Sequence, residues 1–191
     1  MASARNRRRG GQAVKVVVTG PFSAGKTTLI RTISEITVLS TERGITDSTR
    51  SRKAETTVAM DFGRITIDRD LVLYLFGTPG QERFDFMWEI LGEGMIGYLL
   101  LVDAEREDSI VEASAILEAF RRMARVPYVV ALNRAAPDDH ALTERVRETL
   151  EIPADVAIMS CDATDKESVK NVLLALLYAV LDEVETEAVR A

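Results

Sequence analysis

Gly20, Gly25, Lys26 and Thr27 have the residue types and spacing of a phosphate-binding loop, Gly-x-x-x-x-Gly-Lys-Ser/Thr. In such a loop the backbone N–H groups surround phosphate oxygens, the lysine reaches the β- and γ-phosphates, and the threonine hydroxyl binds Mg²⁺. The segment follows an apolar, β-branched run at 14–19 and opens a predicted helix at 25–36, which is the context the loop requires. We therefore predict nucleotide contacts from Gly20, Pro21, Phe22, Ser23, Ala24, Gly25, Lys26, Thr27 and Thr28.

Predicted strands and helices alternate along the rest of the chain. Strand patterns lie at 57–67, 71–76, 98–103, 128–133 and 156–161. Helical patterns lie at 84–91, 109–125, 141–150 and 166–183. Capping boxes, Ser109 with Glu112 and Thr164 with Glu167, predict two of the helix starts. The alternation predicts an α/β fold of the P-loop NTPase type, with a six-stranded, mostly parallel sheet covered by helices on both faces.

Length and charge limit the classes of function. The 191 residues carry a net charge of −6, which argues against general nucleic-acid binding. We predict one domain, residues 13–191, after a disordered basic leader, residues 1–12, whose arginines are interpreted as solvated. The single cysteine, the lack of an apolar run of ~20 residues and the lack of a C-terminal prenylation cysteine predict a cytoplasmic protein without a stable membrane anchor.

Two segments resemble the switch regions of Rab-type small GTPases. They are 57–62, TVAMDF, and 77–84, GTPGQERF. The Thr-Pro-Gly-Gln version is most similar to bacterial Ras-like proteins of the gliding-motility and actinobacterial conservon types, and the resemblance covers about 14–181. It implies a Ras-like three-layer domain with GTP or GDP and Mg²⁺ as ligands. The implied function is a GTP/GDP-dependent molecular switch with slow intrinsic hydrolysis and a Roadblock-type or other protein partner at the switch regions.

The resemblance also implies roles for single residues. Thr57 would close on Mg²⁺ and the γ-phosphate, with Thr56 as a possible substitute, so Thr27 and Thr57 are the predicted metal ligands. The Gly80 amide would contact the γ-phosphate, and Gln81 would orient the attacking water. Gln81, Lys26 and Thr57 are therefore the predicted catalytic residues.

At the metal site the sequence departs from the pattern. Gly77 replaces the aspartate that supports Mg²⁺ in the relatives, so a carboxylate near the metal is missing. Asp103 could supply one in the manner of a Walker B acid, but an aspartate that closes a strand and caps the next loop is the favoured interpretation.

The base-reading motif departs as well. Asn133 stands where its asparagine is expected, but Ala136 replaces the aspartate that binds guanine. Asp138 or Asp139 could reach the base, although solvated loop acids are favoured. Cys161 and Asp162 lie in the loop whose backbone amides would face the base, and the Cys161 thiol is predicted to be packed and unreactive.

The predicted helix at 84–91 is unusually apolar. We expect half of its apolar residues to pack on the sheet, and Phe84 and Trp88, four residues apart, to form an exposed aromatic stripe for a partner. Arginines near the switch segments are interpreted as solvated rather than as an intrinsic arginine finger: Arg43, Arg50, Arg52 and Arg83.

Two other functions stay open. Gly77 and Ala136 would suit a nucleotide-binding scaffold without significant hydrolysis, although the presence of Lys26, Thr27 and Gln81 argues against it. A P-loop ATPase or kinase would need an arginine-rich lid and an acceptor pocket, which the sequence does not indicate.

Overall fold

The computed structural model describes residues 12–40, 60–80 and 86–190. Its strands are β1 (Gln12–Thr19), β2 (Leu39–Ser40), β3 (Asp61–Asp68), β4 (Leu71–Gly77), β5 (Gly97–Asp103), β6 (Tyr128–Asn133) and β7 (Ile158–Cys161). Its helices are α1 (Lys26–Ile33), α2 (Phe86–Gly92), α3 (Glu107–Met123), α4 (His140–Thr149) and α5 (Lys166–Arg190). Of the predicted leader, residues 1–11 lie outside the described residues, and Gln12 already belongs to β1.

The strands form one sheet in the order β2-β3-β4-β1-β5-β6-β7. β4, β1, β5, β6 and β7 run parallel to one another, whereas β3 is antiparallel to β4 and β2 is antiparallel to β3. The predicted α/β fold with six mostly parallel strands is confirmed. The two-residue strand β2 adds a seventh strand at the edge of the sheet.

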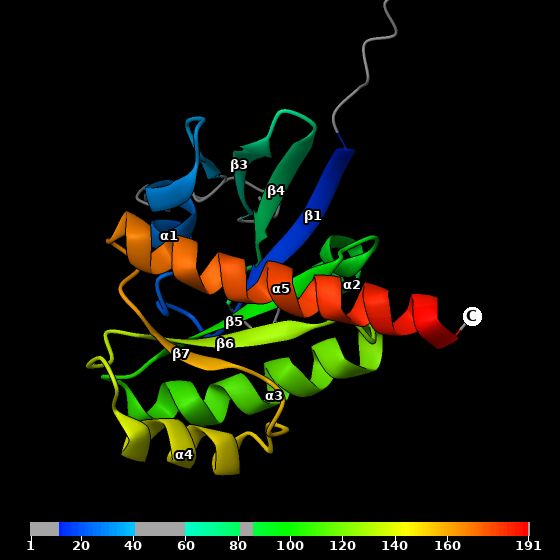
Figure 1. Ribbon diagram of the computed structural model, residues 1–191. Helices are drawn as coiled ribbons and strands as arrows, with labels where there is room; N and C mark the ends of the chain where they lie inside the picture. The colour runs from blue at the N-terminus through cyan, green and yellow to red at the C-terminus, as the bar shows by residue number, and fades with distance from the viewer. Residues whose placement is uncertain (1–11, 41–59, 81–85, 191) are drawn as a thin grey trace, which may run out of the picture.

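Helices cover both faces of the sheet (Figure 1). α1 and α5 pack on one face, while α2, α3 and α4 lie on the other. β1 shows how the sequence builds two cores, since Val16 and Val18 belong to the first and Val17 to the second. Every residue of β5 is buried, as expected for a parallel strand that is covered on both faces.

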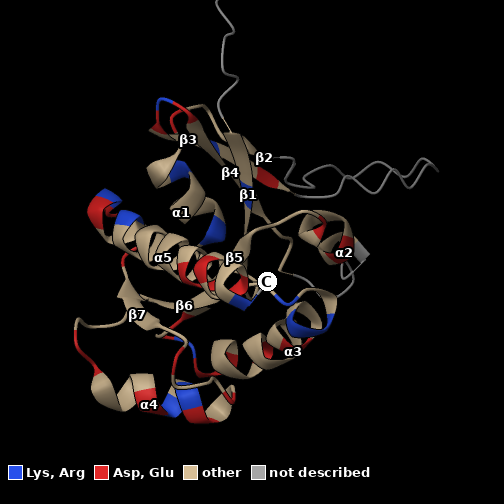
Figure 2. Cartoon of the chain, turned by 45° about the vertical axis from the view of Figure 1, so that its right-hand side comes forward, with Lys and Arg blue, Asp and Glu red and all other residues tan. Residues whose placement is uncertain are grey.

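Charged residues lie mostly on the helices and loops, and the central strands carry few of them (Figure 2). Within the part of the chain that the structure describes, no helix combines the length and the apolarity needed to cross a bilayer.

Both predicted capping boxes are wrong. α3 begins at Glu107, and the buried Ser109 hydroxyl accepts a hydrogen bond from the Asp103 amide at 2.9 Å instead of capping a helix. At the start of α5, the Asp165 carboxylate accepts from the Ser168 amide at 2.7 Å, while the Thr164 hydroxyl donates to Asp162. In each case the hydroxyl forms a hydrogen bond with another polar group nearby, the Asp103 amide or the Asp162 carboxylate.

The predicted exposed stripe of Phe84 and Trp88 is also wrong for Trp88. Its side chain is only 6% exposed and packs against Phe120, with ring centroids 6.1 Å apart. Its indole N–H donates to the Pro79 carbonyl at 3.2 Å. The indole therefore completes the core beneath α2, and Ile90 is an exposed apolar residue of this helix. Phe84 lies outside the described residues.

Candidate functional site

The loop 20–27 lies at the carboxyl end of β1 and leads directly into α1. Gly25 has φ +103°, a backbone conformation that side chains disfavour. A Cβ at this position would lie 2.4 Å from Nδ2 of Asn133, so a larger residue would also clash. The glycine lets the loop pass close to β6 before the first turn of α1. The N–H groups of that turn are predicted to donate hydrogen bonds to phosphate.

Lys26 directs its side chain back into this loop. Its ammonium donates to the Gly20 carbonyl at 2.7 Å and to the Pro21 carbonyl at 2.6 Å. The residue is only 8% exposed. The positive charge is therefore held inside the ring of backbone that the sequence pattern predicts, where phosphate oxygens can compete with the carbonyls for its protons.

Gly80 approaches the same point from the carboxyl side of β4. A Cβ added to it would lie 2.6 Å from the Phe22 amide nitrogen and 2.8 Å from the Lys26 Nζ. A residue with a side chain could not come this close. The structure thus brings together Lys26 and Gly80, two residues predicted from separate segments of the sequence.

Thr27, the predicted metal ligand, contacts a carboxylate. Its hydroxyl donates to Oδ2 of Asp61 at 2.5 Å, and Asp61 is 8% exposed at the start of β3. We gave Asp61 no role in the sequence analysis. The signal that could have found it is its place opposite Gly77 in a β-hairpin, because partners across two strands project side chains to the same face.

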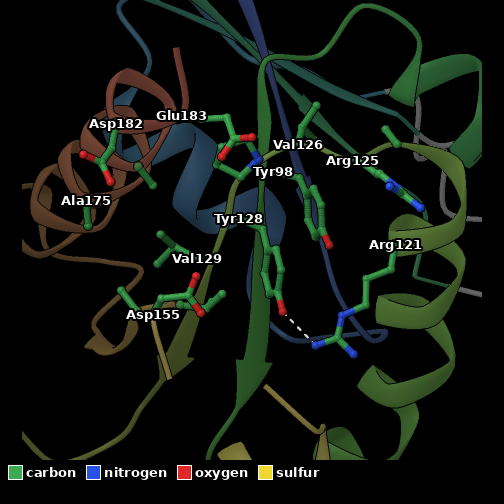
Figure 3. Close-up of a pocket in the computed structure, with 15 residues that line it drawn as sticks. Tyr98, Arg121, Arg125, Val126, Tyr128, Val129, Asp155, Ala175, Asp182 and Glu183 are labelled. Carbon is green, nitrogen blue, oxygen red and sulfur yellow. Dashed lines mark hydrogen bonds between the residues drawn. The ribbon is translucent and has the colours of Figure 1, made fainter. Parts of the chain in front are cut away.

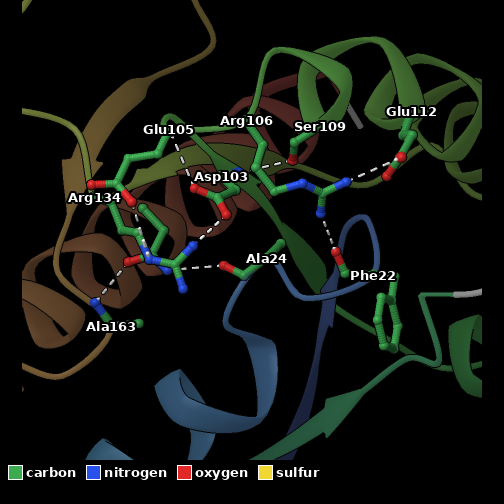
Figure 4. A network of polar contacts seen from close by, with 10 residues as sticks. Phe22, Ala24, Asp103, Glu105, Arg106, Ser109, Glu112, Arg134 and Ala163 are labelled. Atoms are coloured by element: carbon green, nitrogen blue, oxygen red, sulfur yellow. Dashed lines mark hydrogen bonds and ion pairs between the residues drawn. The ribbon is translucent and has the colours of Figure 1, made fainter.

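Two arginines brace the loops around the site (Figure 4). Arg106 donates to the Phe22 carbonyl at 2.8 Å and pairs with Glu112 at 3.3 Å. Arg134 pairs with the buried Asp103, whose other oxygen accepts from the Glu105 amide at 3.1 Å. Asp103 therefore closes β5 and caps the following loop, which is the interpretation that the sequence favoured.

Asn133 links the phosphate loop to the loop before α5. Its side-chain nitrogen donates to the Ala24 carbonyl at 2.9 Å, and its oxygen accepts from the Ala163 amide at 3.1 Å. Asn133 is 4% exposed. Its contacts in the structure are therefore those of a brace, and contact with a base stays a prediction.

The remaining positions near the expected base are partly occupied by local contacts. The Asp139 carboxylate caps α4 through the Leu142 amide at 2.9 Å. The Asp162 amide donates to the Ser168 hydroxyl at 2.9 Å. Hydrogen bonding from Thr164 lowers the pKa of the Asp162 carboxyl. Cys161 is 2% exposed, and burial raises the pKa of its thiol to about 11, in agreement with the prediction of a packed, unreactive cysteine.

Several predicted residues lie outside the described residues. They are Thr57, the neighbouring Thr56, Gln81 and the arginines Arg43, Arg50, Arg52 and Arg83. Thr28, the last of the predicted loop contacts, is exposed on the first turn of α1, and Phe22 is 52% exposed at the tip of the loop.

A cavity of about 530 Å³ lies elsewhere, at the amino ends of β5 and β6 (Figure 3). Tyr98 and Tyr128 stack there with ring centroids 5.0 Å apart. Arg121 donates to the Tyr128 hydroxyl at 2.7 Å and to the Glu151 carbonyl at 3.0 Å. Since the loop 20–27 lies at the carboxyl end of β1, this cavity is separate from the candidate phosphate site.

Comparison with known proteins defines the family. The model of a family described as conserved hypothetical ATP-binding proteins matches residues 38–183, which is more than half of the chain. The chain belongs to this family. An uncharacterized protein of Methanocaldococcus jannaschii is 34% identical over 130 residues, which are 66% of this chain and 73% of that protein. The range matched by the ATP-binding family includes Asp61 and Gly80 and begins after the loop 20–27.

Membership of the ATP-binding family corrects one prediction. The resemblance to bacterial Ras-like small GTPases was wrong, since the matching family is a different one. Of the segments that carried the resemblance, 57–62 and 77–84, the described residues include the start of β3 and Gly80, which lies against the predicted phosphate loop 20–27. Phosphate binding of this kind is common to many nucleotide-binding proteins and does not specify the base. The family's description agrees with the broader prediction of nucleotide binding.

Proposed function

We propose that this protein is a P-loop nucleoside triphosphatase that binds ATP together with Mg²⁺. The observation that carries the proposal is the buried ammonium of Lys26, which lies inside the loop 20–27 with Gly80 beside it. A loop of this kind, at the start of a helix, neutralises phosphate charge with its amides, the helix dipole and the lysine. The description of the family supports ATP as the nucleotide.

The chain's own residues divide the work in this proposal. Lys26 and the loop amides bind the β- and γ-phosphates, and the Gly80 amide approaches the γ-phosphate. Thr27 would hold Mg²⁺, which would supply further neutralisation of charge at the terminal phosphate. Gln81, outside the described residues, orients the attacking water. An arginine that neutralises charge on the transferred phosphate speeds hydrolysis in many P-loop enzymes. Arg106, the arginine described at this loop, contacts Phe22 and Glu112 instead, so hydrolysis is proposed to be slow.

The neighbourhood of the expected base supports ATP over a guanine-specific site. Guanine recognition in a P-loop site uses a carboxylate that accepts from N1–H and the 2-amino group. Position 136 is an alanine, and the carboxylate of Asp139 caps α4. The amide of Asn133 is bound to Ala24 and Ala163. We therefore propose a base site with little preference for guanine.

Competition between nucleotides tests this proposal. The protein is loaded with mant-ATP, a fluorescent ATP analogue, in excess Mg²⁺, and ATP or GTP is added as competitor. We expect ATP to displace the analogue at least as well as GTP, and Ala136→Asp, which supplies the missing carboxylate, to shift the preference toward GTP. Displacement by GTP at a concentration ~100-fold lower than that of ATP would contradict the proposal.

A protein partner that contacts the region around α2 stays part of the proposal. Ile90, which is 60% exposed on α2, could contribute to such a contact, whereas Trp88 is buried and could not. Isolated exposed apolar residues are common on soluble proteins, so Ile90 alone defines no interface.

A further inference from the structure

A carboxylate of β3 occupies the space beside the glycine of β4. Asp61 and Gly77 are direct partners in the antiparallel pairing of the two strands. A Cβ added to Gly77 would lie 3.0 Å from the Asp61 Cβ and 3.3 Å from its Oδ2. The side chain of Asp61 therefore fills the volume that a side chain at position 77 would enter.

Asp61 contacts the hydroxyl oxygen of Thr27, which is the predicted metal ligand. The Thr27 hydroxyl donates its proton to Oδ2 of Asp61 at 2.5 Å. A hydroxyl has one proton and two lone pairs, so this hydrogen bond leaves the lone pairs of Thr27 for a cation. An acceptor behind a metal ligand fixes its orientation and makes it a better donor of electrons. The buried carboxylate also adds negative charge close to the cation.

We propose that Asp61 is the carboxylate that orients Thr27 and supports Mg²⁺ when nucleotide is bound. The carboxylate comes from β3, the strand next to β4, whose residue 77 is a glycine. This inference rests on the proposed function, because the phosphates supply part of the coordination of Mg²⁺. The arrangement also explains the glycine, since a side chain at position 77 would push Asp61 away from Thr27.

The first test measures how Mg²⁺ changes nucleotide affinity, independently of hydrolysis. Binding of mant-ATP is measured in EDTA and across a titration of Mg²⁺. Asp61→Asn keeps the size of the side chain and removes its charge, and we expect the Mg²⁺ concentration for half-maximal tightening to rise ~10–100-fold. Affinity in EDTA is expected to stay the same or to increase, because a negative charge near the phosphates is lost.

The matched control is Asp68→Asn at the other end of β3. Asp68 is exposed, and its carboxylate accepts from the Arg69 amide, far along the strand from Thr27. We expect this variant to titrate like the wild type. An Asp61→Asn titration midpoint within threefold of the wild-type value would overturn the proposal.

A relocation of the acid provides the second test. Gly77→Asp alone would crowd Asp61 and is expected to lower both the melting temperature and the response to Mg²⁺. Of the three closest contacts of a Cβ at position 77, two are with Asp61 and one is with the flexible end of Ile30. Asp61→Gly removes the first two, so the double variant keeps the contact with Ile30. We expect this double variant to recover most of the Mg²⁺ response that Asp61→Gly alone loses. A folded double variant, verified by its melting curve, without any recovery would contradict the proposal.

The two proposals can fail separately. If the wild type binds mant-ATP equally well in EDTA and in Mg²⁺, the role of Asp61 is refuted while nucleotide binding stands. If the wild type binds the analogue in neither condition, the proposed function itself fails.

Discussion

At the end of β6, the side chain of Asn133 connects two loops that both face the candidate site. It donates to the Ala24 carbonyl of the phosphate loop and accepts from the Ala163 amide of the loop before α5. Ala24 and Ala163 are both buried. A residue that we predicted to read a base is, in the structure, a brace for the backbone of the predicted phosphate loop.

Removal of this brace should cost stability before it affects any base contact. In Asn133→Ala, the Ala24 carbonyl and the Ala163 amide lose their partner, and each unsatisfied buried group costs about 1–3 kcal/mol. We expect the free energy of unfolding, measured in urea, to fall by about 2–6 kcal/mol.

The control for this measurement is Asn171→Ala on the exposed side of α5. Alanine is a better helix former than asparagine, so this variant should be as stable as the wild type or slightly more stable. Equal stability of the two alanine variants would refute the bracing role.

Single residues also show what the sequence could and could not predict. The position of the loop 20–27 before α1 was predictable from fixed residue types at fixed spacing, while its binding of phosphate stays a prediction. Asp61 was not predictable, since its importance comes from the register of β3 against β4, which places it opposite Gly77. Thr57 and Gln81 lie outside the described residues, so their roles stay predictions.

At the scale of elements, a hydrogen bond connects α2 to the turn beside the candidate phosphate site. The Trp88 indole donates to the carbonyl of Pro79, and the next residue, Gly80, lies against Lys26 and Phe22. A terminal phosphate held by Lys26 must share this space with Gly80. Binding of a triphosphate is therefore expected to shift Pro79 and, with it, the environment of the indole.

Intrinsic fluorescence can detect this movement, because Trp88 is the one tryptophan of the chain. We expect Mg–ATP to change the emission intensity or wavelength of the wild type, and ADP, which lacks the terminal phosphate, to have a smaller effect. Lys26→Ala serves as the control and should give no change. Identical emission spectra of the wild type with and without saturating Mg–ATP would contradict the coupling.

The elements themselves were predicted better than their ends. Apolar runs such as 98–103 identify strands that are buried on both faces. The structure confirms this for β5, in which every residue is buried. The capping boxes at Ser109 and Thr164 were wrong because these hydroxyls form hydrogen bonds with Asp103 and Asp162, although the start of α5 at Lys166 was predicted. The position of Trp88 was missed because a short apolar helix does not reveal which side faces the sheet.

At the scale of the whole molecule, the sheet brings three separate segments to one place. The carboxyl end of β1 supplies the loop 20–27, the carboxyl end of β4 leads to Gly80, and the start of β3 supplies Asp61. Because β3 runs antiparallel to β4, its first residue lies beside the last residue of β4. The family could not be predicted from the short motifs, since phosphate loops occur in many families with different bases and reactions.

The binding of ATP by the wild type and by Lys26→Ala, measured by calorimetry in excess Mg²⁺, tests the central claim most directly. Lys26 is expected to give two charge-assisted hydrogen bonds to phosphate, together worth about 3 kcal/mol, so the dissociation constant should rise ~100-fold in the variant. Circular dichroism should show that the variant is folded. Equal affinity of the folded variant and the wild type for ATP would contradict the claim that the loop 20–27 binds the phosphates.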